Sequence, residues 1–157
     1  SFPTRRSSDL RIALVVSNQS GCGGAAMSRR DVGETVKKIN DKFPHWFCDT
    51  FKQFNDKEGY LPVDQHMLIA LIAPRPVLIC TAAGYLWEDP EGSFLDLKAA
   101  EPAYKLLTGK GVSVDQMPTV NTLTDGPAAY HIRPGKHSVG AEDWTIFMDY
   151  ADRCGFR

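Results

Sequence analysis

Residues 64–82, DQHMLIALIAPRPVLICTA, carry the clearest signal for the fold. Asp64 is a helix-capping residue type that stands just before the apolar stretch HMLIALIA, and this predicts a helix. Pro74 and Pro76 disfavour any further helix, and the apolar run PVLICTA that follows predicts a buried strand. A helix followed directly by a buried strand is half of the crossover unit that joins parallel strands.

Further helix and strand signals alternate on both sides of this unit. Strands are predicted within Arg11–Ser17, which contains the apolar run IALVV, and at the alternating VSVDQM, residues 112–117. Helices are predicted over residues 26–40, 94–108 and 141–153. Strands that alternate with helices indicate an α/β layered fold with a mainly parallel sheet.

Apolar spacing assigns a buried face to two of these helices. The predicted faces hold Leu95, Ala99, Ala103, Leu106 and Leu107 in residues 94–108, and Trp144, Phe147, Met148 and Ala151 in residues 141–153. Pro102 is an awkward interior residue in the first of them, and we expect it to kink the helix.

The predicted domain organisation is incomplete. Three predicted strands are too few for a parallel sheet to cover both faces and protect its edges, so we expect residues 11–157 to be the C-terminal part of one larger domain. Residues 1–10, SFPTRRSSDL, lack periodicity and resemble a translated sequencing adapter, so we expect them to be non-native. They also lack the apolar core of about 7–15 residues that a signal peptide needs.

The composition excludes several classes of partner. Of 157 residues, 43% are hydrophobic and 24% charged, which is enough apolar material for a core. The net charge of −1 gives no electrostatic reason to expect nucleic acid or an anionic membrane as a partner. The longest apolar runs, residues 67–73 and 76–83, fall short of the roughly 20 residues that cross a bilayer. A small neutral or mildly acidic substrate fits this chain better.

The four cysteines give no sign of a metal site. Cys22, Cys48, Cys80 and Cys154 are widely spaced and form no CxxC pair, so neither a zinc site nor a redox motif is predicted. Cys80 ends an apolar run and is expected to be a buried thiol. Cys22 and Cys48 remain candidates for a disulfide if the protein is exported.

His137 is the first candidate for a catalytic residue. In open α/β sheets, ligands bind in the loops beyond the carboxyl ends of the strands. His137 lies in such a loop, shortly before the last predicted helix, where the chain order nucleophile, acid, histidine would place a general base. The alternative is an ordinary solvated loop histidine.

Several long motifs bear on this choice. The segments IALVVSNQSGCGGAAMSRR, GETV, FPHWF, LPVDQHMLIALIAPRPVL, LWEDPEGSF and YHIRPGKH occur in this order. Over residues 11–156 the chain thereby resembles the bacterial glucuronoyl esterases of carbohydrate esterase family 15. The resemblance implies an α/β-hydrolase fold, a three-layer sandwich with a mainly parallel sheet, and His137 as the catalytic histidine. It also implies hydrolysis of the ester between lignin alcohols and 4-O-methyl-glucuronic acid on xylan, without a metal or cofactor.

The nucleophile that such a histidine serves is missing from the expected place. A serine on a strained elbow should precede the strand IALVV, and no such elbow occurs. Ser20, in QSGCGG, is the nearest serine, but it follows this strand and lacks the GxSxG pattern, which favours a plain loop hydroxyl. We therefore expect a fragment that is inactive by itself.

The catalytic acid is also unassigned. The resemblance places a carboxylate in the loop after the first strand or two residues before Trp87, and this chain has Gln19 and Tyr85 at these positions. Neither residue carries the charge that stabilises an imidazolium. Glu88 and Asp89 are close by, but Asp89 matches the family's WxDP turn and is expected to be structural.

Two further residues are implied in substrate binding. Trp87 resembles the tryptophan that lines the glucuronate pocket, and Glu34, in GETV, resembles a glutamate that contacts sugar hydroxyls. The alternatives are core packing for Trp87 and an exposed helical glutamate for Glu34. The aromatic residues of FPHWFCDTFKQF are expected to form core or a lid, and His66 is expected to be structural.

The leading hypothesis is a serine-type esterase acting on a polysaccharide ester. A degenerate sugar-binding protein is one rival, because Gln19 and Tyr85 replace both acids while the pocket residues remain. An esterase for acetyl or other small esters is another. The resemblance implies a secreted or periplasmic protein, and the chain shows no signal peptide that would indicate this by itself.

Overall fold

The computed structural model describes residues 9–156, so most of the predicted adapter-like segment lies outside the described residues. Its sheet has four strands in the order β1-β2-β4-β3. The strands are β1 (Val15–Asn18), β2 (Val77–Ala82), β3 (Thr122–Leu123) and β4 (Ala128–Arg133). β1, β2 and β4 run parallel, and only β3 is antiparallel to its neighbour. The prediction of a mainly parallel sheet is confirmed.

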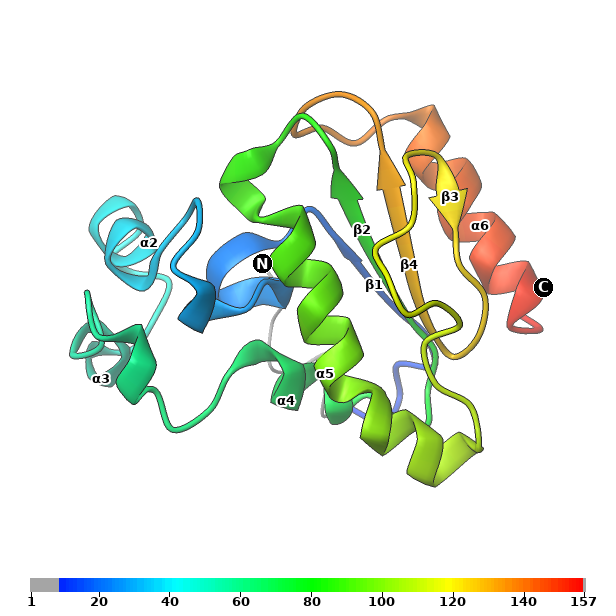
Figure 1. Ribbon diagram of the computed structural model, residues 1–157, viewed down its shortest axis with the longest axis horizontal. Coiled ribbons are helices and arrows are strands. Elements are labelled where there is room, and N and C mark those ends of the chain that lie inside the picture. The colour runs from blue at the N-terminus through cyan, green and yellow to red at the C-terminus, as the bar shows by residue number, and fades with distance from the viewer. Residues whose placement is uncertain (1–8, 157) are drawn as a thin grey trace.

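Helices cover both faces of this sheet. They are α2 (Val36–Lys42), α3 (Asp49–Lys52), α4 (Gln65–Ala70), α5 (Pro90–Thr108) and α6 (Ala141–Arg153). Figure 1 shows α5 in front of the sheet and α6 along its other side, whereas α2 and α3 stand apart from it. The arrangement is a three-layer α/β/α sandwich with a helical excursion.

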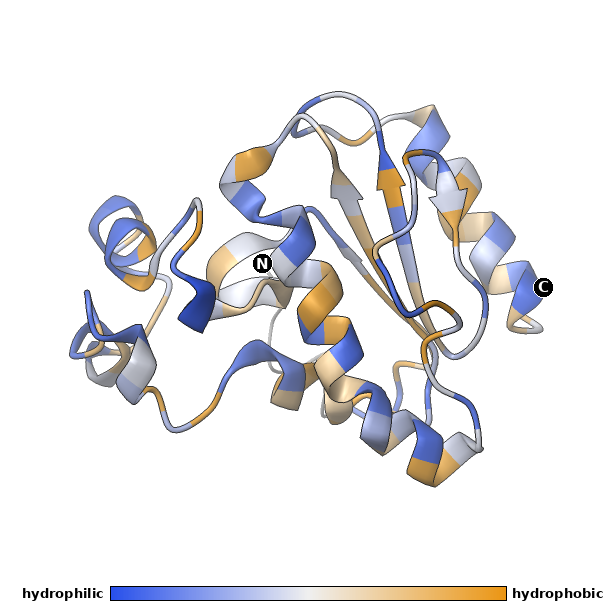
Figure 2. Cartoon of the chain, viewed as in Figure 1, coloured by the Kyte–Doolittle hydropathy of each residue, from blue (hydrophilic) through white to orange (hydrophobic). Residues whose placement is uncertain are grey.

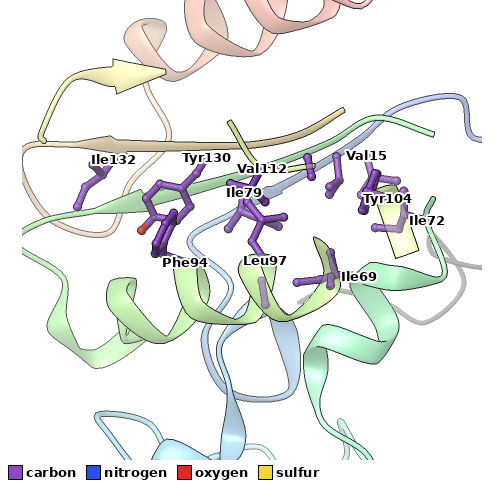
Figure 3. Packing of buried hydrophobic residues seen from close by; sticks show 14 residues of the cluster. Val15, Ile69, Ile72, Ile79, Phe94, Leu97, Tyr104, Val112, Tyr130 and Ile132 are labelled. Carbon is purple, nitrogen blue, oxygen red and sulfur yellow. The ribbon is translucent and has the colours of Figure 1, made fainter. Parts of the chain in front are cut away.

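The side-chain alternation of β2 divides the core into two layers. Val77 and Ile79 join the cluster under α4 and α5, and Leu78 and Cys80 join the cluster under α6. Figure 3 shows the first cluster between the sheet and α5, with Phe94 against Tyr130. Full burial of one such aliphatic side chain contributes about 1.5–3 kcal/mol to folding, so these layers dominate the stability.

The predicted unit at residues 64–82 is present. Asp64 caps α4 by accepting a hydrogen bond from the Gln65 amide. Its carboxylate also accepts from the backbone amides of Ser28 and Arg29, 2.9 and 3.1 Å away. One buried carboxylate therefore caps the helix and anchors the segment that leads toward α2.

The single helix predicted over residues 26–40 is wrong. The chain forms one short turn of helix, η2 (Ser28–Arg30), and the next helical residues are those of α2. Between them Asp31 and Gly33 have φ angles of 57° and 64°, in the left-handed region, which ends a right-handed helix. Gly33 thus separates two elements.

The strand predicted at residues 112–117 is also wrong. That segment is irregular, and the strand that completes the parallel sheet is β4, AAYHIR, which was not predicted. All six residues of β4 are buried, so it shows no alternation of polar and apolar residues. Tyr130, His131 and Arg133 made this interior strand look like a loop.

The predicted helical faces need correction. Figure 2 shows α5 alternating between hydrophobic and hydrophilic stretches along its length. Leu95, Leu106 and Leu107 are exposed, and the buried face holds Phe94, Leu97, Ala100 and Tyr104. In α6, Trp144 and Met148 are exposed while Tyr150 is buried. The helix α5 also starts earlier than predicted, at Pro90, and continues through Pro102.

The cysteines are all free thiols in the structure. Cys80 is buried as predicted, but Cys22 is buried and Cys48 is exposed, so the candidate disulfide between them is not formed. None of the helices in the described part of the chain is long and apolar enough to cross a membrane.

A buried carboxyl group lies between α4 and α5. Asp96 is buried, neither of its oxygens has a hydrogen-bond partner, and its Oδ1 is 3.6 Å from Nδ1 of His66. Burial raises the pKa of Asp96 to about 8, with the nearby Asp64 adding to the effect. His66 is half-buried and faces this carboxyl group, but its Nδ1 has no hydrogen-bond partner, so its structural role stays a prediction.

Replacing Asp96 by Asn should make the chain more stable in mildly alkaline solution. The pKa of Asp96 is higher in the folded than in the unfolded chain, so the stability contributed by its neutral form is lost as the pH rises from about 4 to 8. We expect Asp96→Asn to gain on the order of 1–3 kcal/mol at pH 8 and little at pH 4. Urea unfolding at both pH values measures this. The exposed Asp152→Asn is the charge-matched control, and an equal gain in both variants would contradict the prediction.

Candidate functional site

A hollow of about 290 Å³ opens at the carboxyl ends of the parallel strands. Its walls come from the turn η1 (Gly21–Ala25) after β1, the turn η4 (Leu86–Glu88) after β2, and the α2 region. The structure brings the three predicted site residues, Glu34, Trp87 and His137, to this one hollow. This is the edge of the sheet at which an α/β fold binds ligands.

Trp87 and Glu34 form one unit. The indole Nε1 donates to Glu34 Oε1 over 3.1 Å, and the Glu34 amide donates to the Trp87 carbonyl over 2.9 Å. Glu34 precedes α2 and is therefore not an exposed helical glutamate. Trp87 is 37% exposed and is therefore not a core residue. The pair presents a carboxylate and a partly free indole to the hollow.

Gly33 makes this pairing possible. A Cβ at Gly33 would lie 2.5 Å from the Trp87 carbonyl oxygen, far inside contact distance, and the φ angle there is 64°. Any other residue would push the Glu34 segment away from η4.

Asp89 fixes the other end of the same turn. Its carboxylate caps α5 by accepting from the Gly92 amide over 3.0 Å, and it also accepts from Nε of Arg30 over 2.8 Å. The expectation that Asp89 is structural is thus supported by its contacts. It holds η4, and with it Trp87, at the start of α5.

Arg133, the last residue of β4, organises the loop that carries His137. Its guanidinium donates to the carbonyls of Pro134, Lys136 and Ser138 at 2.7, 3.0 and 2.9 Å. Three carbonyls directed at one cation force the chain to curl around it, which places His137 at the outside of the curl.

Asp143 neutralises this guanidinium from the first turn of α6. Asp143 Oδ1 accepts from Arg133 Nε over 2.8 Å, and its Oδ2 accepts from the Gly140 amide at the helix N-terminus over 2.8 Å. Both side chains are largely buried, so removing either one would leave an uncompensated charge. The loop is therefore fixed to both β4 and α6.

Gln19 holds the same loop from the opposite side. Its Nε2 donates to the Ser138 carbonyl over 2.8 Å, and its Oε1 accepts from the Ser138 amide over 2.9 Å. This bidentate pairing needs one donor and one acceptor, which an amide side chain supplies. At the first of the two positions expected for the acid, the chain thus has a clamp on the residue after His137.

Tyr85, at the second expected position, packs its ring on His137. The two ring centroids are 4.6 Å apart with the planes tilted by 33°. Burial raises the pKa of the Tyr85 hydroxyl, so the side chain is neutral at physiological pH. Among residues 9–156, no carboxylate lies within ion-pair distance of His137.

Glu88 is a buried carboxyl group in the wall of the hollow. It is 1% exposed, and neither carboxyl oxygen has a hydrogen-bond partner. Burial raises its pKa to about 9, against an opposing effect of Arg133. Glu88 is therefore protonated at neutral pH and offers a neutral O–H donor instead of a negative charge.

Ser20 shares the hollow with His137, but no hydrogen bond joins them. Its hydroxyl is buried and unpartnered. The other histidines lie elsewhere, and His131, for example, has its Nδ1 3.0 Å from the Thr122 carbonyl. In the described residues, no group of three or more His, Cys, Asp and Glu side chains is arranged to hold a metal ion.

Sequence reasoning missed the residues that hold the site together. The sequence marks Gln19 only as a neutral residue at an acid position, whereas its clamp depends on Ser138, which lies opposite it in the fold. Arg133 was visible as part of the motif YHIRPGKH, where an arginine four residues before the histidine is a candidate for bonding the intervening carbonyls. The burial of Glu88 has no signal in the sequence.

Comparison with known proteins identifies similar chains. A family model described as fungal glucuronyl esterase matches residues 7–108. A protein named carbohydrate esterase MZ0003, from an unknown prokaryotic organism, is 54% identical over 144 residues, which cover 92% of this chain and 33% of that protein. The chain thus spans about a third of the length of this relative.

Solved structures of the same kind share the fold. A promiscuous CE15 esterase from a marine bacterial metagenome superposes with a TM-score of 0.92 at 53% identity, covering 94% of this chain and 37% of that one. A glucuronoyl esterase from Solibacter usitatus gives a TM-score of 0.87 at 42% identity, covering 94% of this chain and 38% of that one. The chain therefore has the fold of part of an α/β-hydrolase domain, as the sequence predicted.

Replacing Gln19 by Glu should loosen the loop that carries His137. A carboxylate keeps the acceptor for the Ser138 amide but loses the donor, and it places a negative oxygen against the Ser138 carbonyl. The Ser138 carbonyl keeps its hydrogen bond from Arg133, so the loss is that of one hydrogen bond, about 0.5–1.5 kcal/mol, and we expect the Ser138 amide to exchange its hydrogen faster by about two- to tenfold. Gln116→Glu, an exposed replacement, is the control. Unchanged exchange at Ser138 would show that the clamp is dispensable.

Proposed function

Because the chain belongs to the glucuronoyl esterases of carbohydrate esterase family 15, we propose that it forms the sugar-binding wall and supplies the catalytic histidine of a serine-type carboxylic ester hydrolase. The observation that carries this proposal is the meeting of Glu34, Trp87 and His137 in one hollow from three separate segments of the chain. The reaction needs no metal or cofactor.

The Trp87–Glu34 unit supplies the sugar contacts. The Glu34 carboxylate accepts hydrogen bonds from vicinal hydroxyls, and the Trp87 indole offers an apolar face while its N–H stays donated to Glu34. Both groups are held in place before any ligand arrives, because Gly33 and Asp89 fix the segments that carry them. A preorganised site of this kind suits the hydroxyl-rich ring of a glucuronate ester.

His137 acts as the general base in this scheme. It takes the proton of an attacking serine hydroxyl, and then returns that proton to the leaving alcohol as the acyl-enzyme forms. Ser20 is not placed for this attack, since its hydroxyl makes no hydrogen bond to His137. We propose that the nucleophile belongs to the two thirds of the relatives' length that this chain does not match.

The substrate class follows from the same family. We propose the ester between a lignin alcohol and 4-O-methyl-glucuronic acid on xylan, with export from the cell as the consequence of a polymeric substrate. Glu34 and Trp87 favour this substrate over acetyl and other small esters, because an acetyl group offers no hydroxyls for them to bind.

A sugar-binding protein without catalysis is a second candidate. The observation that favours it is the pair of neutral side chains, Gln19 and Tyr85, at both positions expected for the acid. Such a protein would bind the uronate through Glu34 and Trp87 and leave the ester intact.

Removing the carboxylate of Glu34 should weaken uronate binding. Leaving bound hydroxyls unpaired costs about 1–3 kcal/mol, which is roughly a 5- to 150-fold loss of affinity. We expect this loss for Glu34→Gln when methyl glucuronate is titrated into the 157-residue chain by calorimetry, and a smaller one for Trp87→Phe. Glu142→Gln, outside the hollow, is the control. Equal binding by Glu34→Gln and the parent chain would exclude the assigned role.

A chimaera separates the enzyme from the binding protein. Residues 11–157 would replace the matching third of carbohydrate esterase MZ0003, and hydrolysis of benzyl glucuronate would be measured. We expect turnover, and a loss of about 10²–10⁴-fold in kcat for His137→Ala. His45→Ala, an exposed replacement, should be silent. Turnover that appears only after Tyr85→Asp would favour the sugar-binding candidate. Turnover by the 157-residue chain alone would refute the proposal that the nucleophile lies outside this chain.

A further inference from the structure

An aromatic pair occupies one end of the hollow and has no role in the reaction described so far. The rings of Phe43 and Trp46 stack with centroids 4.0 Å apart and planes within 8° of parallel. Both rings line the hollow, and Trp46 is nevertheless 48% exposed. A large apolar face held parallel to its neighbour and open to solvent is a surface on which a ligand can stack.

Contacts between neighbouring side chains give the order of groups at the catalytic end of the hollow. His137 touches the ring of Tyr85, which leads directly into η4 and Trp87. Trp87 donates a hydrogen bond to Glu34, and Nζ of Lys38 lies over the Trp87 ring, 5.2 Å from its centroid. The uronate unit formed by Glu34 and Trp87 therefore lies between His137 and the helix α2.

The helix α2 connects the Trp87–Glu34 unit to the aromatic pair. Lys42 lies one helical turn beyond Lys38, and its Nζ is 5.3 Å from the centroid of the Phe43 ring, which stacks on Trp46. Figure 1 shows α2 set apart from the sheet, away from the loop after β4 that carries His137. The aromatic pair is thus at the end of the hollow opposite the reacting ester.

The segment that carries the pair is anchored in the protein. Phe47 packs so closely on η1 that a Cβ at Gly23 would lie 2.6 Å from its ring. Phe43 and Phe47 both pack on the small core built around Val36 and Ile39. The exposed face of Trp46 is therefore preorganised, and stacking on it costs little conformational entropy.

The position of the pair decides which part of a substrate it can meet. A glucuronate ester extends in two directions: through its carbonyl to the alcohol, and through its ring to the rest of the glycan. The alcohol leaves next to His137, at the other end of the hollow. What reaches Trp46 is the glycan, whose pyranose rings have C–H faces that pack on an indole and hydroxyls that accept from the Lys42 ammonium.

We propose that Trp46, backed by Phe43 and flanked by Lys42, is a second carbohydrate subsite that binds a neutral sugar unit of the glycan attached to the uronate. This inference rests on the proposed function, because it takes Glu34 and Trp87 to hold the uronate ring. The subsite would let the protein distinguish a uronate on a polysaccharide from the free monosaccharide ester.

The test compares a short and a long ligand on the 157-residue chain by calorimetry. The short ligand is methyl glucuronate, and the long one is a xylo-oligosaccharide that carries one 4-O-methyl-glucuronate. We expect tighter binding of the long ligand, and a loss of about three- to tenfold for it in Trp46→Ala with the short ligand unchanged. Trp46→Phe, which keeps a stacking ring, should lose less. Circular dichroism confirms that each variant is folded.

Trp144→Ala is the matched control, because Trp144 is 59% exposed and packs on Phe147 in α6, outside the hollow. It should leave both affinities unchanged. If Trp46→Ala is silent while Glu34→Gln still weakens the short ligand, the subsite is refuted and the proposed function stands. If Trp46→Ala weakens both ligands equally, Trp46 contacts the uronate itself and the proposal is wrong. If neither ligand binds the parent chain, both the proposed function and the proposed subsite are refuted.

Discussion

The site depends on one buried cation and the carbonyls that surround it. Arg133 ends an interior strand in which every residue is buried, and its charge must be satisfied locally because bulk water is excluded. Asp143 balances the charge, and the carbonyls of Pro134, Lys136 and Ser138 complete the shell. The loop path, and so the location of His137, follows from this requirement.

The same logic places the other half of the site. Asp89 and Asp64 each use one buried carboxylate to cap a helix and to bind a second segment, which ties η4 and η2 to the layer of α4 and α5. Charge-assisted hydrogen bonds of this type are about twice as strong as neutral ones, so they fix short turns that have little apolar surface of their own. Trp87 and Glu34 are therefore positioned by groups that lie outside the lining of the hollow.

Sequence patterns predicted those parts of the molecule that are governed by local rules. The helix and strand at residues 64–82 have a cap, a periodic apolar run and proline stops, and they were found. β4 was missed because its polar residues Tyr130, His131 and Arg133 are buried, with partners outside the strand: Thr81, the Thr122 carbonyl and Asp143. The motifs located Glu34, Trp87 and His137, but the Gln19 clamp depends on a contact across 119 residues that no local pattern records.

Gln19 and Tyr85 show what the chain gains and loses at the two acid positions. An amide at position 19 fixes the loop at any pH, and a neutral ring at position 85 packs against the ring of His137, which stays exposed. A tyrosine face stabilises a nearby cation by about 0.5–2 kcal/mol. Loss of the acid from a catalytic triad lowers kcat by about 10⁴-fold, which corresponds to roughly 5 kcal/mol. The ring is therefore too weak a substitute, and Glu88 cannot help while it is protonated. In the proposed esterase, rapid hydrolysis through His137 therefore needs a carboxylate that the described residues do not supply.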